Sequence, residues 1–285
     1  MAKLKIMAIY AHPADPITDC GGTLAMHAER GDDVVVLTMT HGGRIHPNLF
    51  AEEWRKEKPD LNIVNAKKDD IIIKKKKELE RAAEIIGINK LITLDYDDNY
   101  IGVSEDIVLK IAEEIANERP DVIIADYPMN AAYPDSHTMA TIMVFHAINR
   151  AGLCLKNIDG HSEFHVKQIY LTKLPVNARD GLSLGGLRND LYIDISSVVG
   201  KKIKAMDQFV SQGYNAEFAR KFVESHDGDR GRAAGVNFAE AFFRVYNETE
   251  KYLPVTDYAM NKDVLTTHRS YSMMNIREMF PIKRE

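Results

Sequence analysis

The sequence predicts an α/β fold, a Rossmann-like three-layer sandwich in which helices cover both faces of a mostly parallel sheet. Two observations carry this prediction. Apolar segments of strand length alternate with segments of helical periodicity through residue 150, and this alternation is typical of a parallel sheet built from strand–helix–strand units. The apolar segments are also nearly continuous runs, as expected for strands that are buried on both faces.

Four strands are predicted in the first half of the chain, at residues 4–10, 33–39, 90–94 and 121–126. They are short runs rich in β-branched and aliphatic residues, and the run DVVVLTM at residues 33–39 is typical. In parallel sheets the reactive loops follow the carboxyl ends of the strands. We therefore expect functional side chains directly after these segments.

The helices between these strands are predicted at residues 18–30, 67–87, 104–118 and 136–152. The second has apolar positions at helical spacing and Gly87 as its C-cap. Its lysine run, residues 74–77, is expected to form a solvated face. The third helix is opened by Ser104 as N-cap.

The pattern changes in the second half of the chain. Strands are expected at residues 165–174 and 190–196, and helices at 197–213, 215–227 and 237–251. We expect a single domain over residues 1–253. The remaining stretch, 254–285, has little periodicity and is predicted to be a C-terminal extension that wraps the surface or a neighbouring subunit. A homo-oligomer is therefore expected.

Composition restricts the class of protein. The 285 residues are 45% hydrophobic and 28% charged, with a formal net charge of −5. This charge lacks the basic footprint of a nucleic-acid-binding protein, and no apolar run has the roughly 18–20 residues of a membrane span. The apolar N-terminal segment has no small-residue cleavage site and is expected to be a strand. The two cysteines do not form a disulfide framework, so a reducing cytoplasm is expected.

A candidate metal site follows two of the predicted strands. His12 and Asp15 lie directly after residues 4–10, and His137 opens the helix that follows residues 121–126. Loops at the same edge of a parallel sheet can bring these side chains together. Two imidazoles and one carboxylate are the protein ligands of many catalytic zinc sites. A His-x-x-Asp pair also occurs by chance, and a histidine at a helix start is often a capping or packing residue.

The motifs AHPADPITDCGGTLA, GDDVVVLTMTHGG, KKKELERAAEIIG, RPDVIIADYP and YPDSHTMA, in this order, resemble the LmbE/PIG-L family of zinc-dependent deacetylases. The resemblance covers residues 5–146 and returns more faintly near residues 192–212 and 230–244. It implies that His12, Asp15 and His137 bind Zn²⁺ and that the substrate is a small molecule.

Two positions depart from the family pattern. The resemblance implies an aspartate that acts as general base where this chain has Ala14, and a methyl group cannot accept a proton. It also implies a histidine, which helps to protonate the leaving group, where this chain has Tyr133. The Ala14 motif instead resembles the 4-oxalomesaconate hydratase branch of the family, which adds water to a carbon–carbon double bond. That branch has acidic residues after the second strand, where this chain has THGGRIHPN.

Three functions remain open on the sequence. The first is a zinc-dependent hydrolase that removes the acetyl group from an N-acetylated sugar or related small molecule. The second is a zinc-dependent hydratase of an unsaturated di- or tricarboxylate, which Ala14 favours. The third is a non-catalytic relative that binds a small molecule. Fold alone does not distinguish them.

Further candidate residues lie in the loops that follow the strands. Asp135 and His41 are candidates for the missing base, and Tyr133 either donates to a developing oxyanion or stacks in its loop. Arg44, His46 and Asp126 are candidates for binding the substrate. Arg44 can grip a carboxylate with two hydrogen bonds, His46 can carry a proton, and Asp126 either orients a metal-bound imidazole or caps a turn.

Overall fold

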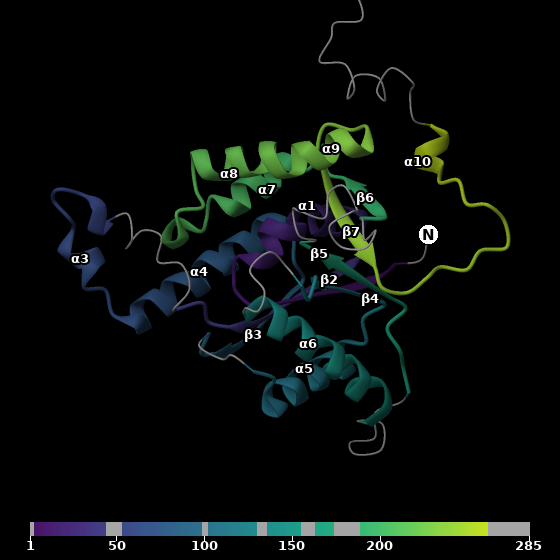
Figure 1. The fold of residues 1–285 in the computed structure, drawn as a ribbon, viewed down its shortest axis with the longest axis horizontal. Coiled ribbons are helices and arrows are strands. Elements are labelled where there is room, and N and C mark those ends of the chain that lie inside the picture. The colour runs from purple at the N-terminus through teal and green to yellow at the C-terminus, as the bar shows by residue number, and fades with distance from the viewer. Residues whose placement is uncertain are drawn as a thin grey trace, which may run out of the picture.

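The computed structural model describes residues 3–43, 53–98, 102–129, 136–154, 163–173 and 189–261. In these ranges seven strands form one sheet, in the order β3-β2-β1-β4-β5-β7-β6 (Figure 1). The strands are β1 (Lys5–Tyr10), β2 (Asp33–Thr40), β3 (Lys90–Tyr96), β4 (Val122–Asp126), β5 (Gln168–Thr172), β6 (Leu191–Asp194) and β7 (Ala239–Arg244).

Strands β1 to β5 pair in parallel, and β7 pairs antiparallel with both β5 and β6. The first strand, β1, lies in the middle, between β2 and β4. Ile6 is therefore opposite Val34 on one side and Val122 on the other. This order places the carboxyl ends of β1 and β4 next to each other, where the sequence predicts the metal ligands.

Helices cover both faces of the sheet, so the predicted three-layer architecture is confirmed (Figure 1). Helices α5 and α6 pack on one face, and α1, α4, α7 and α8 contribute to the core on the other. The α-helices are α1 (Asp15–Arg30), α3 (Leu61–Val64), α4 (Lys68–Ile86), α5 (Glu105–Glu118), α6 (Ser136–Asn149), α7 (Val199–Met206), α8 (Glu217–Phe222), α9 (Gly228–Ala234) and α10 (Asp257–Met260).

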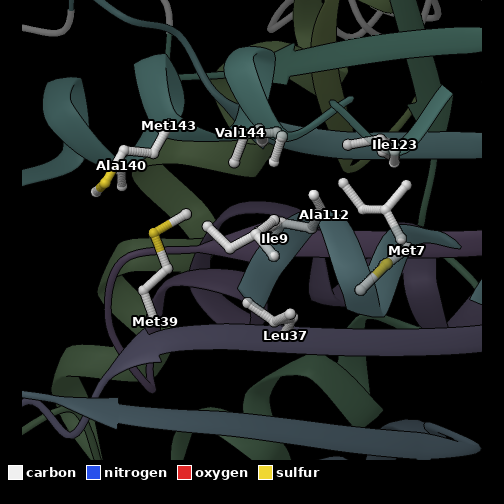
Figure 2. Packing of buried hydrophobic residues seen from close by; sticks show 14 of the residues in the cluster. Met7, Ile9, Leu37, Met39, Ala112, Ile123, Ala140, Met143 and Val144 are labelled. Carbon is white, nitrogen blue, oxygen red and sulfur yellow. The ribbon is translucent and has the colours of Figure 1, made fainter. Parts of the chain in front are cut away.

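Two hydrophobic cores result from the alternation of side chains along the strands. Met7 and Ile9 of β1 point to the face of α5 and α6, where Figure 2 shows them near Ala112. The intervening residue Ala8 points to the opposite core. Each large apolar side chain buried in this way contributes about 1.5–3 kcal/mol, so both faces of β1 anchor the layers.

The predicted helix at residues 67–87 is confirmed with nearly the same bounds. Gly87 is its C-cap and has φ 92°, in the left-handed region where a side chain is disfavoured. Ser104 is the N-cap of α5, although its side chain makes no capping hydrogen bond. The helix predicted at residues 18–30 begins earlier, at Asp15, with Pro16 in its first turn.

The prediction of a helix at residues 237–251 is wrong, because residues Ala239–Arg244 form strand β7. A short apolar run does not separate strand from helix by periodicity, and here pairing with β5 and β6 decides the outcome. The helix predicted at residues 197–213 ends at Met206 and is followed by a 3₁₀ turn. The helix predicted at residues 215–227 continues through a π-helical turn, Val223–Asp227, into α9.

The lysine run of α4 is not uniformly solvated, which corrects the prediction for residues 74–77. Lys75 is 1% exposed. Its ammonium donates to the carbonyl oxygen of Gly42, in the loop after β2. Burial lowers the pKa of Lys75 to about 8, against the opposing charges of Asp98 and Glu78.

The predicted C-terminal extension is described only up to residue 261. Within it the Tyr258 hydroxyl of α10 donates to Asp194 Oδ2 at 2.7 Å, which attaches the extension to β6. None of the described helices combines the length and apolar character needed to cross a bilayer. The domain division and the expected homo-oligomer stay predictions.

Candidate metal centre

The loop between β1 and α1 presents His12 and Asp15 at the carboxyl edge of the sheet. Asp15 is the first residue of α1, where a carboxylate is stabilised by the positive end of the helix. Its Oδ2 accepts a hydrogen bond from the backbone N–H of His12 at 2.9 Å. This bond fixes the carboxylate beside the imidazole that precedes it by three residues.

His137 reaches the same place from the neighbouring strand. It is the second residue of α6, which follows β4 in the chain. The hydroxyl of Thr141, one turn later, donates to the carbonyl oxygen of Asp126 at 3.0 Å and so ties α6 to the end of β4. Because β4 lies beside β1, His137 and His12 meet with their rings nearly perpendicular, at 87°.

The three predicted metal ligands converge on one point. His12 Nδ1 lies 3.2 Å from Asp15 Oδ2 and 3.2 Å from His137 Nε2, and His137 Nε2 lies 3.4 Å from Asp15 Oδ2. Ligands at about 2.0–2.1 Å from a tetrahedral zinc ion are roughly 3.3 Å apart. The three atoms therefore have the spacing of three corners of a zinc tetrahedron, with the fourth corner left for another ligand.

The electrostatics of this triad also fit a bound cation. Burial alone would lower the pKa of His137, but the Asp15 carboxylate outweighs it and raises that pKa to about 10. Burial would raise the pKa of Asp15, but Lys173, His137 and His12 hold it well below its usual range. The site thus stabilises positive charge between the two imidazoles.

Lys173 connects the triad to two further carboxylates. Its Nζ lies 2.8 Å from Asp19 Oδ2, 3.5 Å from Asp126 Oδ2 and 3.6 Å from Asp15 Oδ1. Lys173 directly follows β5 and has φ 56°. This backbone conformation is uncommon for residues other than glycine. Strained backbone of this kind concentrates at functional sites.

Asp126 lies at the base of the site. It is 2% exposed, and its Oδ1 accepts a hydrogen bond from the Thr172 hydroxyl at 3.2 Å. Burial raises its pKa to about 7, and nearby Asp19 and Asp15 add to this effect while Lys173 opposes it. Its predicted orientation of a metal-bound imidazole and its predicted contact with substrate both stay predictions.

A cavity of about 190 Å³ opens beside the triad, many times the roughly 10–15 Å³ that holds one water. Polar and charged groups form one part of its lining, and aromatic rings form another. The lining residues are His12, Pro13, Asp15, Thr18, Asp19, Gly42, Lys75, His137, Lys173, Gln212, Tyr214, Phe218, Phe222 and His226.

His41 is described, but it does not line this cavity. Its Nδ1 lies 3.0 Å from Asp98 Oδ1 and accepts a hydrogen bond from the backbone N–H of Gly43 at 2.9 Å. With Asp97 and Asp98 it forms a second group of potential ligand atoms, although Lys68 forms an ion pair with Asp97. The catalytic role of His41 stays a prediction.

Four other predicted site residues lie outside the described residues. They are Arg44 and His46 in the loop after β2, and Tyr133 and Asp135 in the loop before α6. Their predicted roles with substrate and in catalysis are unchanged. Ala14 is described, and its methyl group is 1% exposed and packs in the core shared by α1 and α4.

Three charged residues that line the cavity were not predicted from the sequence. Lys173 lies at the carboxyl end of the predicted strand 165–174, and Asp19 follows Asp15 by one helical turn, so the position of each in the sequence pointed to the site. Lys75 has a weaker signal. It lies four residues before Leu79 on α4 and therefore on the same buried face.

A second cluster of buried charge, formed by Lys202, Asp227 and Glu240, holds the middle of α1 in place. Lys202 Nζ lies 2.6 Å from Asp227 Oδ2 and 2.7 Å from Glu240 Oε1, and all three side chains are 0% exposed. Glu240 accepts hydrogen bonds from the backbone N–H groups of Gly22 and Thr23 at 2.8 and 2.7 Å. Helix α1 departs from helical geometry nearby, at Cys20, so Glu240 holds the helix where it bends.

The fold and the triad define an α/β protein with a candidate metal centre at the carboxyl edge of its parallel strands. Comparison with protein families makes this more specific. Residues 7–148 match the family model PIG-L, described as GlcNAc-PI de-N-acetylase. The chain therefore contains a domain of the PIG-L/LmbE family, and the resemblance predicted from its motifs is confirmed.

Individual relatives include both deacetylases and a hydratase. The chain is 25% identical to diacetylchitobiose deacetylase of Thermococcus kodakarensis, over 73% of this chain and 70% of the relative. It is 23% identical to 4-oxalmesaconate hydratase of Pseudomonas putida, over 82% and 83%. The crystal structure of 4-carboxy-2-hydroxymuconate hydratase from Pseudomonas putida KT2440 has a TM-score of 0.70 and 21% identity, covering 88% of this chain and 100% of that one. This structural likeness supports the fold.

Proposed function

We propose that the chain is a zinc-dependent hydrolase that removes the acetyl group from an N-acetylated sugar or a closely related small molecule. The observation that carries this proposal is the spacing of His12 Nδ1, Asp15 Oδ2 and His137 Nε2, which are 3.2–3.4 Å from one another. The match to the PIG-L family and to a sugar deacetylase supports the choice of reaction.

His12, Asp15 and His137 would hold the ion. A bound zinc ion supplies Lewis acidity and lowers the pKa of water to about 7. The chain must then accept a proton from the attacking water and return one to the nitrogen that leaves. Ala14 provides no carboxylate for this task, so another side chain must perform it.

Asp19 is our candidate for this proton transfer. It lines the cavity one helical turn after Asp15, and its side chain is 3% exposed. Lys173 Nζ lies 2.8 Å from Asp19 and 3.6 Å from Asp15, so it links the two carboxylates. As water oxygen bonds to the acyl carbon, Asp19 takes its proton. The carbon–nitrogen bond then breaks, and the proton passes to the amine.

The test measures acetate release from N-acetylglucosamine and N,N′-diacetylchitobiose by the zinc-loaded chain. We expect turnover that a chelator abolishes and zinc restores. Asp19→Asn should lower kcat by about 100-fold or more, as is typical for a lost general base, and should retain stoichiometric zinc. Asp70→Asn, at an exposed position of α4, is the matched control. Absence of acetate release from every N-acetylated compound tested contradicts the proposal.

A hydratase acting on an unsaturated tricarboxylate is the second candidate. Ala14 and the cationic side chains of Lys75 and Lys173 in the cavity favour it, as does the similarity to 4-oxalmesaconate hydratase. Addition of water to a double bond expels no amine, so it does not need the same acid. Loss of ultraviolet absorbance from a conjugated tricarboxylate, with no acetate release from amides, would favour this function over the first.

A further inference from the structure

Gln212 is a buried residue of the cavity lining whose side-chain amide makes no hydrogen bond to any described residue. It is 4% exposed and lines the cavity together with the metal triad. Its Oε1 atom is buried and has no hydrogen-bond partner in the described part of the chain. Native interiors pair nearly all of their buried polar atoms, so an unpaired amide in a cavity lining points to a partner that the cavity admits.

Other polar groups of the lining are already engaged within the chain. The Thr18 hydroxyl donates to the carbonyl oxygen of Asp15 at 3.1 Å, and the Lys75 ammonium donates to the carbonyl oxygen of Gly42. The amide of Gln212 differs from these groups because both of its functions are available to a ligand.

The turn that carries Gln212 is held in one position. It is a 3₁₀ turn, Val210–Gln212. Glu78 of α4 accepts hydrogen bonds from the backbone N–H of Ser211 at 2.9 Å and from its hydroxyl at 2.6 Å, and both side chains are buried. Gly213 ends the turn with φ 68°, a conformation that favours glycine. A backbone fixed in this way lowers the ordering cost of binding a ligand.

Two neighbours place this turn at the cavity. Lys75 lies three residues before Glu78 on α4, hence on the same face of that helix, and it lines the cavity. Tyr214, two residues after Gln212, lines it as well. Burial raises the pKa of Tyr214 to about 12, and the charge of Asp15 adds to this effect. The chain that follows the turn therefore approaches the metal triad.

The chemistry of the amide selects the ligand. An amide presents a hydrogen-bond acceptor and a donor side by side, so a ligand satisfies both only if it donates and accepts. Sugar hydroxyl groups do both. A carboxylate at neutral pH only accepts, and it would leave the Oε1 atom of Gln212 unpaired. Sites that hydrogen-bond a substrate hydroxyl strongly reject analogues without it, so the amide favours a sugar over an unsaturated acid.

We propose that Gln212 is a substrate-recognition residue, whose amide binds hydroxyl groups of a saccharide while the acyl group lies at the metal triad. This inference rests on the proposed deacetylase function, and it names the side chain that distinguishes a sugar from an unsaturated carboxylate.

The test compares the native, zinc-loaded full chain with Gln212→Leu, which has a similar volume and no hydrogen-bonding group. The Kd for glucosamine, a deacetylated sugar that requires no turnover, and the KM for N,N′-diacetylchitobiose should each rise about tenfold, which corresponds to roughly 1.4 kcal/mol, with little change in kcat. Cyclohexylamine has an amine on a six-membered ring but no hydroxyl, so it should bind equally to both chains.

Thermal unfolding without ligand separates recognition from a structural role. The amide of Gln212 has no partner among the described residues, so Gln212→Leu should leave the Tm unchanged or raise it, whereas a structural role would lower it. Gln208→Leu is the matched control. Gln208 lies outside the cavity lining, and its Nε2 donates to the carbonyl oxygen of Lys204 at 3.0 Å, so this variant should keep the native Kd and KM.

Each alternative outcome has a separate meaning. Equal glucosamine binding by the native chain and Gln212→Leu overturns the recognition role, and so does absence of saccharide binding by the native chain. A lower Tm with weaker binding of cyclohexylamine also overturns it and assigns Gln212 to the structure of the turn. Tighter binding of cis-aconitate than of glucosamine, weakened in Gln212→Leu, overturns it in favour of an unsaturated acid.

The same measurements distinguish this inference from the proposed function. Acetate release with an unchanged KM in Gln212→Leu overturns the recognition role alone. Glucosamine binding that depends on Gln212, without any acetate release, contradicts the proposed function and leaves the recognition role standing.

Discussion

The molecule contains two clusters of buried charge, and they differ in how completely their charges are neutralised. Lys202 lies between Asp227 and Glu240 with Nζ–oxygen distances of 2.6 and 2.7 Å, and Glu240 also accepts two backbone N–H groups. Burial alone would lower the pKa of Lys202, but the two carboxylates raise it above its usual range. Every group in this cluster has a close partner, and none is exposed to solvent.

The cluster around Lys173 is not balanced in this way. One ammonium faces three carboxylates, and only Asp19 is within 3 Å of it. The Oδ2 atom of Asp126 is buried and accepts no hydrogen bond from any described residue. Beside this excess of negative charge, two imidazole nitrogens lie 3.2 Å apart. The first cluster is therefore a neutralised structural element, whereas the second leaves negative charge beside the candidate metal centre.

The largest expected effect comes from removing a metal ligand. His137→Ala should abolish stoichiometric zinc binding and any turnover, because the two remaining ligands, His12 and Asp15, are too few to hold the ion. In the native chain zinc at 1,000 times its Kd should add about 4 kcal/mol to the free energy of unfolding, and the variant should show no such increase. Metal analysis and thermal unfolding with and without zinc measure both effects.

His146→Ala is the matched control for that variant. His146 lies on the same helix, α6, but its side chain is exposed. We expect unchanged zinc content and an unchanged zinc response. If His137→Ala retained full zinc stoichiometry, the distinction between the two charge clusters would be lost.

Lys202→Met should produce the largest loss in the free energy of unfolding, and this loss should not depend on zinc. Removing one partner of a buried ionic cluster leaves uncompensated charge and costs about 3–5 kcal/mol. Urea unfolding measures the loss. Lys201→Met, whose lysine pairs with Glu29 and is 43% exposed, should cost less than about 1 kcal/mol. Similar costs for both variants would contradict the structural role given to Lys202.

Lys173→Met should have a smaller effect that depends on zinc. Its side chain is 25% exposed, so we expect a loss below the buried-pair range, about 2 kcal/mol in the absence of metal. A divalent cation supplies positive charge to the same carboxylates and should restore most of that loss. Urea unfolding of both lysine variants, with and without zinc, measures this difference, since zinc should not restore the stability of Lys202→Met. A loss in Lys173→Met that ignores zinc would argue against a cation site.

Lys75→Met should show the smallest effect, visible as a pH trend. Burial lowers the pKa of Lys75 to about 8, whereas a lysine in the unfolded chain has a pKa of about 10.4. Between these values the unfolded chain binds a proton that the folded chain has lost, so the native chain gains stability as the pH rises. We expect the free energy of unfolding of the native chain to rise relative to Lys75→Met from pH 8 to pH 10.

Lys76→Met provides the comparison on the next residue. Its side chain is 45% exposed and pairs with Asp95. The free-energy difference between the native chain and this variant should stay nearly constant over the same pH range. A matching trend in both variants would show that the burial of Lys75 does not perturb its ionisation.

The parts of the fold that the sequence predicted are those that local patterns determine. Strand β2 is a β-branched run, and α4 repeats apolar residues at helical spacing up to Gly87. Strand β7 was missed because its residues, AEAFFR, become a strand only through pairing with β5 and β6. Glu240 in that strand has no local reason to be buried, since its partner Lys202 is 38 residues away.

The site divides in a similar way. His12, Asp15 and His137 were predicted because they follow strands and match a family motif, and the structure brings them together. The stacked rings of Tyr214, Phe218, Phe222 and His226 were not predicted, although these residues repeat every four positions. The series spans two irregular turns. Its turn at Ala216 and its π-helical turn at Val223–Asp227 break the regular pattern that a sequence reading follows.

The hydrogen bonds from α1 to Glu240 limit where the chain can be truncated. The family match ends at residue 148, so a fragment cut there would carry all three candidate metal ligands. It would lack Glu240, which accepts hydrogen bonds from the backbone N–H groups of Gly22 and Thr23. It would also lack Ile195, which lies so close that a Cβ at Gly22 would be 2.8 Å from it. The candidate ligands thus lie before residue 148, whereas residues that hold α1 in place lie well after it. Transplanting the centre into another protein requires residues up to β7.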